Sequence, residues 1–308
     1  NFNRGAVVAM MMLIPSVISI ALLHYLERYN IRYTKISAVD LRKNRVRDGI
    51  FMAGSAMILL MLISVFAVIF VVPLVREWPY QTSFTMEHVI DTLTDSSLFG
   101  VYQNSLFVAV CTAAAGLLIT YGAALATARS GLKGRLKAVI DSIALVTNTI
   151  PGMVIGIAFM FIFSGTPLQN TFLLIIICNV VHFFSTPYLM MKNSLSKLNS
   201  SWEATAALMG DSWIKTIVRI ITPNMVSTLL EVFGYYFVNA MVTVSAVIFI
   251  AGARTMVITT KMKELQYYTK FNEVFVLSLL ILATNLAVKG ILAVLMRSGK
   301  IGRQQARA

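Results

Sequence analysis

Seven long apolar runs constrain the fold of this chain more than any other feature of its sequence. Each run is about as long as the roughly 20 helical residues that cross ~30 Å of hydrocarbon. The runs are 5–26, 50–75, 102–128, 138–163, 171–191, 225–251 and 273–296. Only helices or closed barrels satisfy every backbone polar group in lipid, and a barrel would show short alternating segments instead. We therefore predict an all-α polytopic membrane protein with seven transmembrane helices.

The composition excludes an ordinary soluble domain. Of the 308 residues, 57% are hydrophobic and only 13% are charged, whereas about a quarter are charged in soluble proteins. The net charge of +13 comes from basic residues in short loops between the apolar runs. This distribution is typical of membrane topology, so we expect the lipid bilayer as a partner and not nucleic acid. Cys111 and Cys178 lie inside apolar runs, which excludes a disulfide scaffold or a cysteine-rich zinc module.

The distribution of Lys and Arg predicts the orientation in the cell membrane. Basic residues concentrate in alternate connections, 27–49, 129–137, 192–223 and 297–308, and we place these segments in the cytoplasm. The N-terminus then lies outside and the C-terminus is cytoplasmic. The external loop 254–272 is an exception, because it carries Arg254, Lys261, Lys263 and Lys270.

This topology divides the chain into four parts. Residues 1–26 form one transmembrane helix, 27–49 a basic cytoplasmic linker, 50–296 a six-span domain with a cytoplasmic loop at 192–223, and 297–308 a cytoplasmic tail. The chain starts at an external span and carries no initiator Met. We therefore expect the first span to be the last one of a preceding half in a longer membrane protein.

The loop between the fifth and sixth runs predicts a helix, a turn and a second helix. Ser200 and Glu203 have the spacing of a capping box. Gly210 can adopt the left-handed conformation that ends a helix, and Asp211 can cap the next one. An apolar stripe made by Trp202, Ala206, Met209 and Trp213 is too short to cross lipid, so it either lies on the membrane surface or fits a groove in a partner.

This loop resembles the EAA loop of binding-protein-dependent ABC importer permeases. Gly210 and Pro223 keep the family spacing, although Ala204 occupies the usual Glu position and Glu203 stands one place early. The resemblance implies coupling helices that dock into ATPase subunits. The residues that it implies for this coupling are Trp202, Glu203, Ala204, Ala206, Met209, Gly210, Asp211, Trp213 and Pro223.

Two further stretches resemble the iron(III)-type permeases, whose relatives move thiamine, polyamines or aminoethylphosphonate. They are Thr-Ile-Pro-Gly-Met-Val-Ile-Gly at 149–156 and Thr-Val-Ser-Ala-Val-Ile-Phe at 243–249. The resemblance implies three partners: nucleotide-binding subunits, an extracytoplasmic solute-binding protein and a second permease half. No cofactor is expected, because the chain lacks Gly-x-x-x-x-Gly-Lys-Ser/Thr and ATP would be bound by the partner subunits.

Polar residues within the apolar runs are candidates for a substrate path, since such groups normally face the bundle or a cavity. Pro151 is expected to kink the fourth run, and Asn179 and His182 are close enough on the fifth to share hydrogen bonds. The path candidates are Asn148, Pro151, Asn179, Tyr235, Asn239, Thr243 and Ser245. For the small residues of the fourth run, Gly152 and Gly156, close helix packing is the alternative to a role in the path.

A secondary transporter and an intramembrane enzyme are the two alternative classes of protein. A secondary transporter driven by an ion gradient usually has charged groups near the bilayer midplane, and the central runs carry no acid at that depth. An intramembrane enzyme is not expected, since the chain has neither His-Glu-x-x-His nor Gly-x-Ser-x-Gly. A metal site is not expected either, because a lone His in a membrane core is seldom a ligand.

Overall fold

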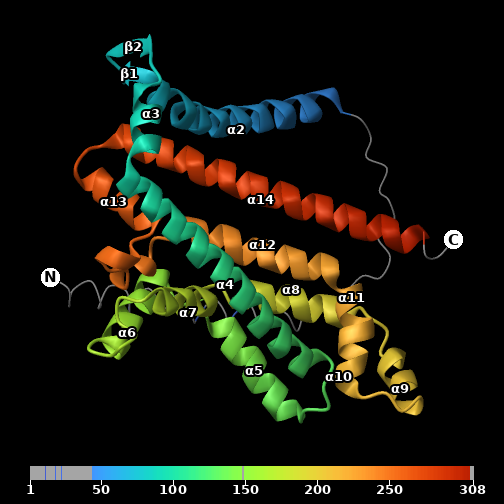
Figure 1. Cartoon of the computed structure of the whole chain (residues 1–308). Helices are drawn as coiled ribbons and strands as arrows, with labels where there is room; N and C mark the ends of the chain where they lie inside the picture. Colours follow the sequence, from blue (N-terminus) through green and yellow to red (C-terminus); the bar gives the residue numbers. More distant parts are fainter. Residues whose placement is uncertain (1–10, 12–17, 19–21, 23–43, 148, 306–308) are drawn as a thin grey trace.

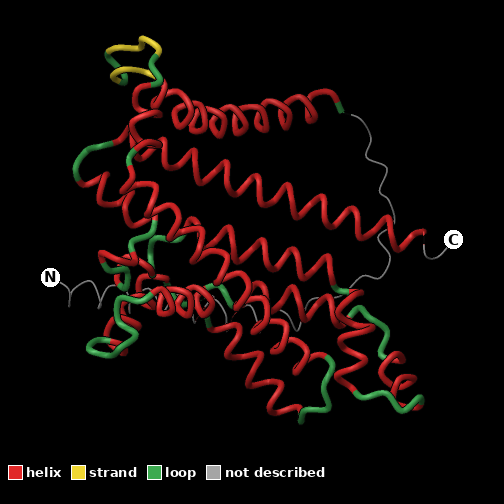
Figure 2. The backbone as a smooth tube through the Cα atoms, viewed as in Figure 1, coloured by secondary structure: helices red, strands yellow, loops and turns green. Residues whose placement is uncertain are grey.

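The computed structural model describes residues 44–147 and 149–305 and the single positions 11, 18 and 22, with only the backbone described for 299–305. Most of this part is helical (Figures 1 and 2). The elements are α2 (Arg45–Val71), η1 (Val72–Leu74), β1 (Val75–Glu77), β2 (Gln81–Phe84), α3 (Glu87–Thr94), α4 (Ser96–Ala128), α5 (Gly134–Val146), α6 (Gly152–Phe163), α7 (Phe172–His182), α8 (Ser185–Ser196), α9 (Ser201–Leu208), α10 (Trp213–Thr216), η2 (Ile217–Ile221), α11 (Thr222–Asn224), α12 (Val226–Val242), η3 (Val247–Phe249), η4 (Ala253–Thr255), α13 (Ile258–Tyr267) and α14 (Phe271–Gln305).

The helical membrane fold predicted from the apolar runs is confirmed, but the count of seven spans is not. In the described part, 3 helices are long and apolar enough to cross a membrane, namely Arg45–Leu74, Ser96–Ala128 and Phe271–Ser298. Two bent helix pairs, α7 with α8 and the segment Trp213–Asn224 with α12, raise the number to 5 if each pair is one span. The predicted span 5–26 lies almost entirely outside the described residues.

Two predicted spans are shorter or less regular than the apolar runs suggested. The fourth, 138–163, is broken between Val146 and Gly152 into α5 and α6. Pro151 precedes the first residue of α6 with an extended ψ of 137°, so it ends an interruption instead of kinking a continuous helix. The sixth, 225–251, is helical only to Val242, and irregular chain with 3₁₀ turns follows. Apolar composition alone did not reveal either break.

The core lies where α4 crosses the second half of the chain. Helix α4 packs against α12, α8 and α7 (Figure 1). Small residues allow this approach: a Cβ added at Gly116 of α4 would lie 2.7 Å from the ring of Tyr236 on α12, which is fully buried. Close helix packing therefore accounts for the glycine at this position.

Helix α2 differs from the other long helices because none of its side chains is buried, although its residues are strongly apolar. A helix that is apolar on all sides fits lipid or another membrane protein, not water. The Asn44 side chain caps its first turn by accepting from the backbone N–H groups of Val46 and Arg47 at 3.1 and 3.3 Å.

The connecting elements gather at two opposite ends of the molecule. The β1–β2 hairpin, α3 and α13 lie at one end, and α9, α10 and α11 lie at the other (Figure 1). The antiparallel hairpin pairs Val75 with Phe84 and Glu77 with Gln81. This arrangement places the predicted helix–turn–helix loop far from the loop that carries Lys261 and Lys263.

Candidate functional site

The α9–α11 element, residues 201–224, forms the predicted helix–turn–helix and projects beside the ends of α8 and α12 (Figure 1). Its turn depends on Gly210, which has φ +79°. That left-handed conformation confirms the prediction for this residue, since glycine adopts it without the cost of a Cβ. A Cβ added here would meet no atom within 4 Å, so only the backbone angle restricts the position.

The caps predicted around this turn are wrong in detail. Ser200 makes no side-chain cap on α9; the Asn199 side chain accepts from the Ser201 N–H at 3.0 Å instead. Ser212, not Asp211, caps α10 by accepting from the Lys215 N–H at 3.3 Å, and Asp211 pairs with the Lys215 ammonium group. Both changes place the capping side chain one residue away from the predicted one.

An exposed apolar surface covers the tip of the α9–α11 element. Leu208 and Met209 are 89% and 77% exposed, and Ile214 and Trp213 are 69% and 44% exposed. Exposed apolar side chains that gather on one element commonly mark an interaction site. Leu208 and Ile214 were missed in the sequence because the predicted stripe was followed through Ala206, which is buried.

Glu203 does not belong to that exposed surface. Its carboxylate Oε1 lies 2.8 Å from Nε of Arg129, at the end of α4, and only 20% of the Glu203 side chain and 6% of the Arg129 side chain are exposed. The same guanidinium donates to the carbonyls of Leu198 and Asn199 at 3.1 Å each. The residue next to Glu203, Ala204, is exposed.

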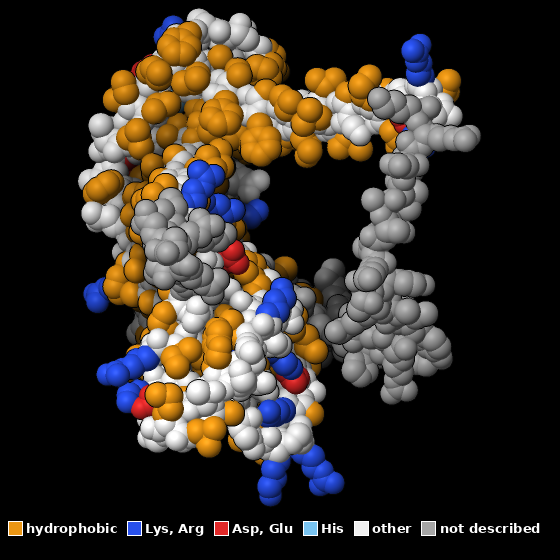
Figure 3. All heavy atoms as spheres, turned by 90° about the vertical axis from the view of Figure 1, so that its right-hand side faces the viewer, with side chains coloured by type: hydrophobic (Ala, Val, Ile, Leu, Met, Phe, Trp, Pro, Cys, Tyr) orange, Lys and Arg blue, Asp and Glu red, His pale blue; other side chains and the backbone are white. Residues whose placement is uncertain are grey.

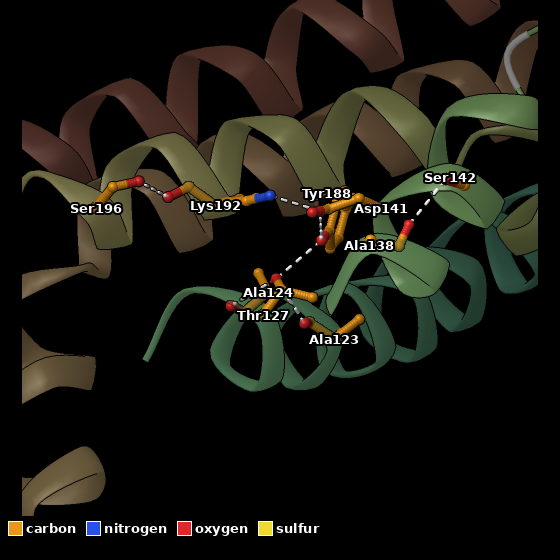
Figure 4. A network of polar contacts seen from close by, with 9 residues as sticks. All are labelled: Ala123, Ala124, Thr127, Ala138, Asp141, Ser142, Tyr188, Lys192 and Ser196. Carbon is orange, nitrogen blue, oxygen red and sulfur yellow. Dashed lines mark hydrogen bonds and ion pairs between the residues drawn. The ribbon is translucent and has the colours of Figure 1, made fainter. Parts of the chain in front are cut away.

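A second polar cluster joins α4, α5 and α8 close to this pair (Figure 4). Asp141 Oδ1 lies 2.5 Å from Tyr188 Oη and 2.5 Å from Lys192 Nζ, and Tyr188 Oη lies 2.8 Å from Thr127 Oγ1. Tyr188 is fully buried. The sequence did not point to this cluster, because its members are far apart along the chain.

The segment that follows the tip changes direction before it enters the bundle. Residues Ile217–Ile221 form a π-helical turn, Pro223 lies within the first residues of α11, and α12 is bent by 77° from the preceding helices. The hydroxyl of Thr222 bonds to that of Tyr121 on α4 at 2.7 Å. Pro223 therefore lies at a bend that is held against α4.

The two other stretches singled out in the sequence pack against each other. A Cβ added at Gly152 would lie 2.2 Å from Ser245 Oγ and 3.0 Å from the His182 ring, and one at Gly156 would lie 2.3 Å from the Ala246 carbonyl oxygen. The start of α6 and the segment after α12 are therefore in direct contact, with Pro151 and Ser245 at this junction.

Tyr235 and Asn239 line cavities beside α12. A cavity of about 340 Å³ between α8, α12 and α14 is lined by both residues together with Glu231 and Lys289. A smaller cavity of about 200 Å³ lies where the chain is interrupted after α5 and after α7. Tyr235 lines it together with Thr147, His182 and Thr186. Glu231, Lys289 and the hydroxyls of the smaller cavity thus lie beside two of the candidate residues.

Of the other path candidates, Thr243 and Asn179 line neither of these two cavities. Thr243 is buried, and its carbonyl accepts from the Thr259 hydroxyl at 2.7 Å. Asn179 is fully buried, and neither its amide atoms nor His182 Nδ1 has a hydrogen-bond partner among the described residues, so the predicted shared network is wrong. Asn148 lies outside the described residues. Within the described part of the chain, no group of three His, Cys, Asp or Glu could hold a metal ion.

The match to a known family agrees with these features. A family model described as binding-protein-dependent transport system inner membrane component matches residues 116–298, which is more than half of the chain. The chain belongs to this family. It is an ABC importer permease and a multi-pass inner membrane component, which leaves the secondary transporter and the intramembrane enzyme without support.

Curated relatives indicate the iron-type subfamily. The putative ferric transport system permease protein FbpB 1 of Haemophilus influenzae is 32% identical over 149 residues, 47% of this chain and 22% of that protein. The ferric transport system permease protein FbpB of Actinobacillus pleuropneumoniae is 32% identical over 151 residues, 48% of this chain and 21% of that protein. The match therefore spans about a fifth of each relative's length.

Solved structures share the fold at low sequence identity. A bacterial ABC transporter involved in the import of the acidic polysaccharide alginate gives a TM-score of 0.67 at 13% identity, covering 82% of this chain and 97% of that one. The inward-facing methionine ABC transporter MetNI gives 0.55 at 12% identity, covering 66% of this chain and 95% of that one. These likenesses confirm a permease fold.

Proposed function

We propose that this chain forms, with a second permease half, the membrane pathway of an ATP-driven iron(III) importer. The 32% identity to two ferric permeases favours iron(III) over the thiamine, polyamine or aminoethylphosphonate of the wider group. Substrate would be delivered by an extracytoplasmic binding protein. ATP would be bound and hydrolysed by separate nucleotide-binding subunits, so the chain itself is not an enzyme and needs no cofactor.

The α9–α11 element is the observation that carries this proposal. Its exposed apolar tip, formed by Leu208, Met209, Trp213 and Ile214, would fit an apolar groove in an ATPase subunit. Gly210 would hold the two short helices at the angle that this groove requires. Among the residues implied by the resemblance, Trp202, Ala204 and Asp211 would border the contact, whereas Ala206 and Glu203 would support the element from inside.

The path would run beside α12. Tyr235 and Asn239 line the larger cavity there, and Ser245 and Pro151 meet at the junction of the two iron-type stretches. We infer that these four residues contribute to the route, together with the hydroxyls near His182. Asn148, Asn179 and Thr243 remain predictions.

Orientation follows from the same arrangement. Basic side chains project from the face that carries the α9–α11 element (Figure 3), which supports a cytoplasmic position for this end of the molecule. The C-terminus would then be cytoplasmic. The β1–β2 hairpin and α13 would face the binding protein on the outer side, and the segment 1–26 would be a further span that starts outside.

Transport in proteoliposomes tests the proposal. The assembled transporter, with its ATPase subunits and a binding protein loaded with radiolabelled iron(III), should accumulate iron only when ATP is present and hydrolysable. A proton ionophore should leave this uptake unchanged. Uptake that survives ATP depletion but is lost with the ionophore would reject an ATP-driven importer, and ATP-driven uptake of a different ligand copurified with the binding protein would reject iron(III).

A further inference from the structure

The side chain of Glu203 has a different environment from the rest of the α9 surface. Leu208 is 89% exposed, but the Glu203 side chain is only 20% exposed, and its second carboxylate oxygen, Oε2, is buried without a hydrogen-bond partner among the described residues. A carboxylate in this position is not available to an ATPase subunit that docks on the exposed tip. Its charge is instead balanced by Arg129.

Arg129 joins the end of α4 to α9 and to the connection that precedes α9. Its guanidinium pairs with Glu203 of α9 and donates to the carbonyls of Leu198 and Asn199, which lie between α8 and α9. The two terminal nitrogens make the hydrogen bonds to the carbonyls, and the approach of Nε to Glu203 is an ion pair that lacks hydrogen-bond geometry. A guanidinium presents several N–H groups in a fixed plane, whereas an ammonium group is a compact point charge. The end of α4 is thereby fixed to the start of the α9–α11 element.

Two other contacts tie α4 to the same region. Tyr121 bonds to Thr222 at 2.7 Å, where the α9–α11 element ends, and Thr127 bonds to Tyr188 of α8 at 2.8 Å. The last turns of α4 therefore hold both ends of the projecting element. Among these contacts only the Arg129–Glu203 pair joins two charges, and protein largely encloses it. Removing one partner would leave a buried charge without compensation, so this contact should be the most sensitive to substitution.

We propose that Arg129 is a positioning residue that locks the α9–α11 element to α4, so that a movement imposed on the element by the ATPase passes to α4 as a rigid body. Glu203 then acts within this subunit and is not a contact to the ATPase. This inference rests on the proposed coupling role of the element, but it assigns Arg129, which the family resemblance did not single out, and it changes the role of Glu203.

Charge exchange in the assembled transporter tests the pair. Arg129→Glu should reduce ATP-driven uptake at least tenfold while basal ATPase activity persists, and Arg129→Lys should recover only part of the loss. Adding Glu203→Arg to Arg129→Glu should restore uptake several-fold, because the opposite charges face each other again. Arg135→Ala, at an exposed arginine on α5, is the matched control and should behave as wild type.

A distance measurement separates positioning from a loss of folding. Spin labels on cysteines placed at the exposed positions Gly122 of α4 and Ala207 of α9, with Cys111 and Cys178 replaced, should keep one narrow distance with and without ATP. Arg129→Ala should broaden that distance distribution in protein that still assembles with the ATPase.

Three outcomes would overturn the inference. One is a narrow distance in Arg129→Ala, and another is a double exchange that does not recover uptake. The third is Glu203→Ala abolishing ATPase association while Arg129→Ala leaves it intact, which would make Glu203 a direct docking residue. Failure of the proposed function itself is distinguishable, because the wild-type transporter would then show no ATP-driven uptake.

Discussion

Replacing Gly210 by Val tests whether the turn of the α9–α11 element determines docking. The residue has φ +79°, and a Cβ there would touch nothing within 4 Å. Any effect of the substitution therefore comes from backbone conformation and not from a clash. A β-branched residue strongly resists this conformation, whereas Asn adopts it comparatively readily.

The size of the effect follows from the conformational cost. A left-handed residue other than glycine costs about 1–2 kcal/mol, and for Val we take about 2 kcal/mol. Since ~1.4 kcal/mol corresponds to tenfold, the ratio of molecules with the native turn to molecules without it should fall roughly 30-fold. α9 is held by Arg129, so the strain should be relieved mainly by movement of α10. The apparent affinity for the ATPase subunit should decrease by at most this factor, because only the native turn is competent to dock and the affinity follows the fraction of molecules that have it.

The assay is a titration of detergent-solubilised permease with its ATPase subunit, combined with uptake in proteoliposomes. Gly210→Val should show weakened association and uncoupled transport, with little change in melting temperature because movement of α10 relieves the strain locally. Gly210→Asn should stay within a few-fold of wild type. Wild-type affinity in the Val variant, or equal losses in Val and Asn, would refute the role assigned to the turn conformation.

Three further tests by substitution have defined outcomes. Gly156→Ala should destabilise the folded protein by about 1–3 kcal/mol in thermal unfolding, because its Cβ would lie 2.3 Å from a backbone oxygen, whereas Gly122→Ala, with open space around it, should be neutral or slightly stabilising. Leu208→Glu should abolish copurification of the ATPase subunit without lowering the melting temperature; unimpaired copurification would exclude this apolar contact. Lys261→Glu with Lys263→Glu should slow association with the binding protein and flatten its salt dependence; unchanged kinetics at low salt would exclude this loop from docking.

Local patterns predicted those parts of the structure that depend on neighbouring residues. Long apolar runs were sufficient for the helical membrane fold, since the requirement to satisfy backbone groups in lipid leaves few alternatives. The turn at Gly210 was predictable for a similar reason, because glycine alone adopts positive φ without cost. The exact caps were less predictable, as Asn199 and Ser212 compete for the same roles as their neighbours.

Features that depend on tertiary contacts could not be predicted in this way. Glu203 had two local interpretations, a capping residue or a docking residue, and the structure shows a third because Arg129 approaches from α4. The break between Val146 and Gly152 lies within an apolar run, and packing against Ser245 and the His182 ring explains the need for Gly at 152. Hydropathy counts residues along the chain and carries no information on such contacts.

The connection from the α9–α11 element to the proposed path is short and structurally continuous. Helix α12 starts directly after the 77° bend, carries Tyr235 and Asn239 on its cavity side, and ends at Val242, three residues before Ser245. A rotation of α12 about the bend would therefore move the cavity lining and the junction with Gly152 at the same time. Because Tyr121 holds Thr222 at the bend while Arg129 holds the start of the element, α4 limits how the element can move relative to α12. Docking at the exposed tip would then be converted mainly into movement of whole helices, which is the movement that alternating access requires.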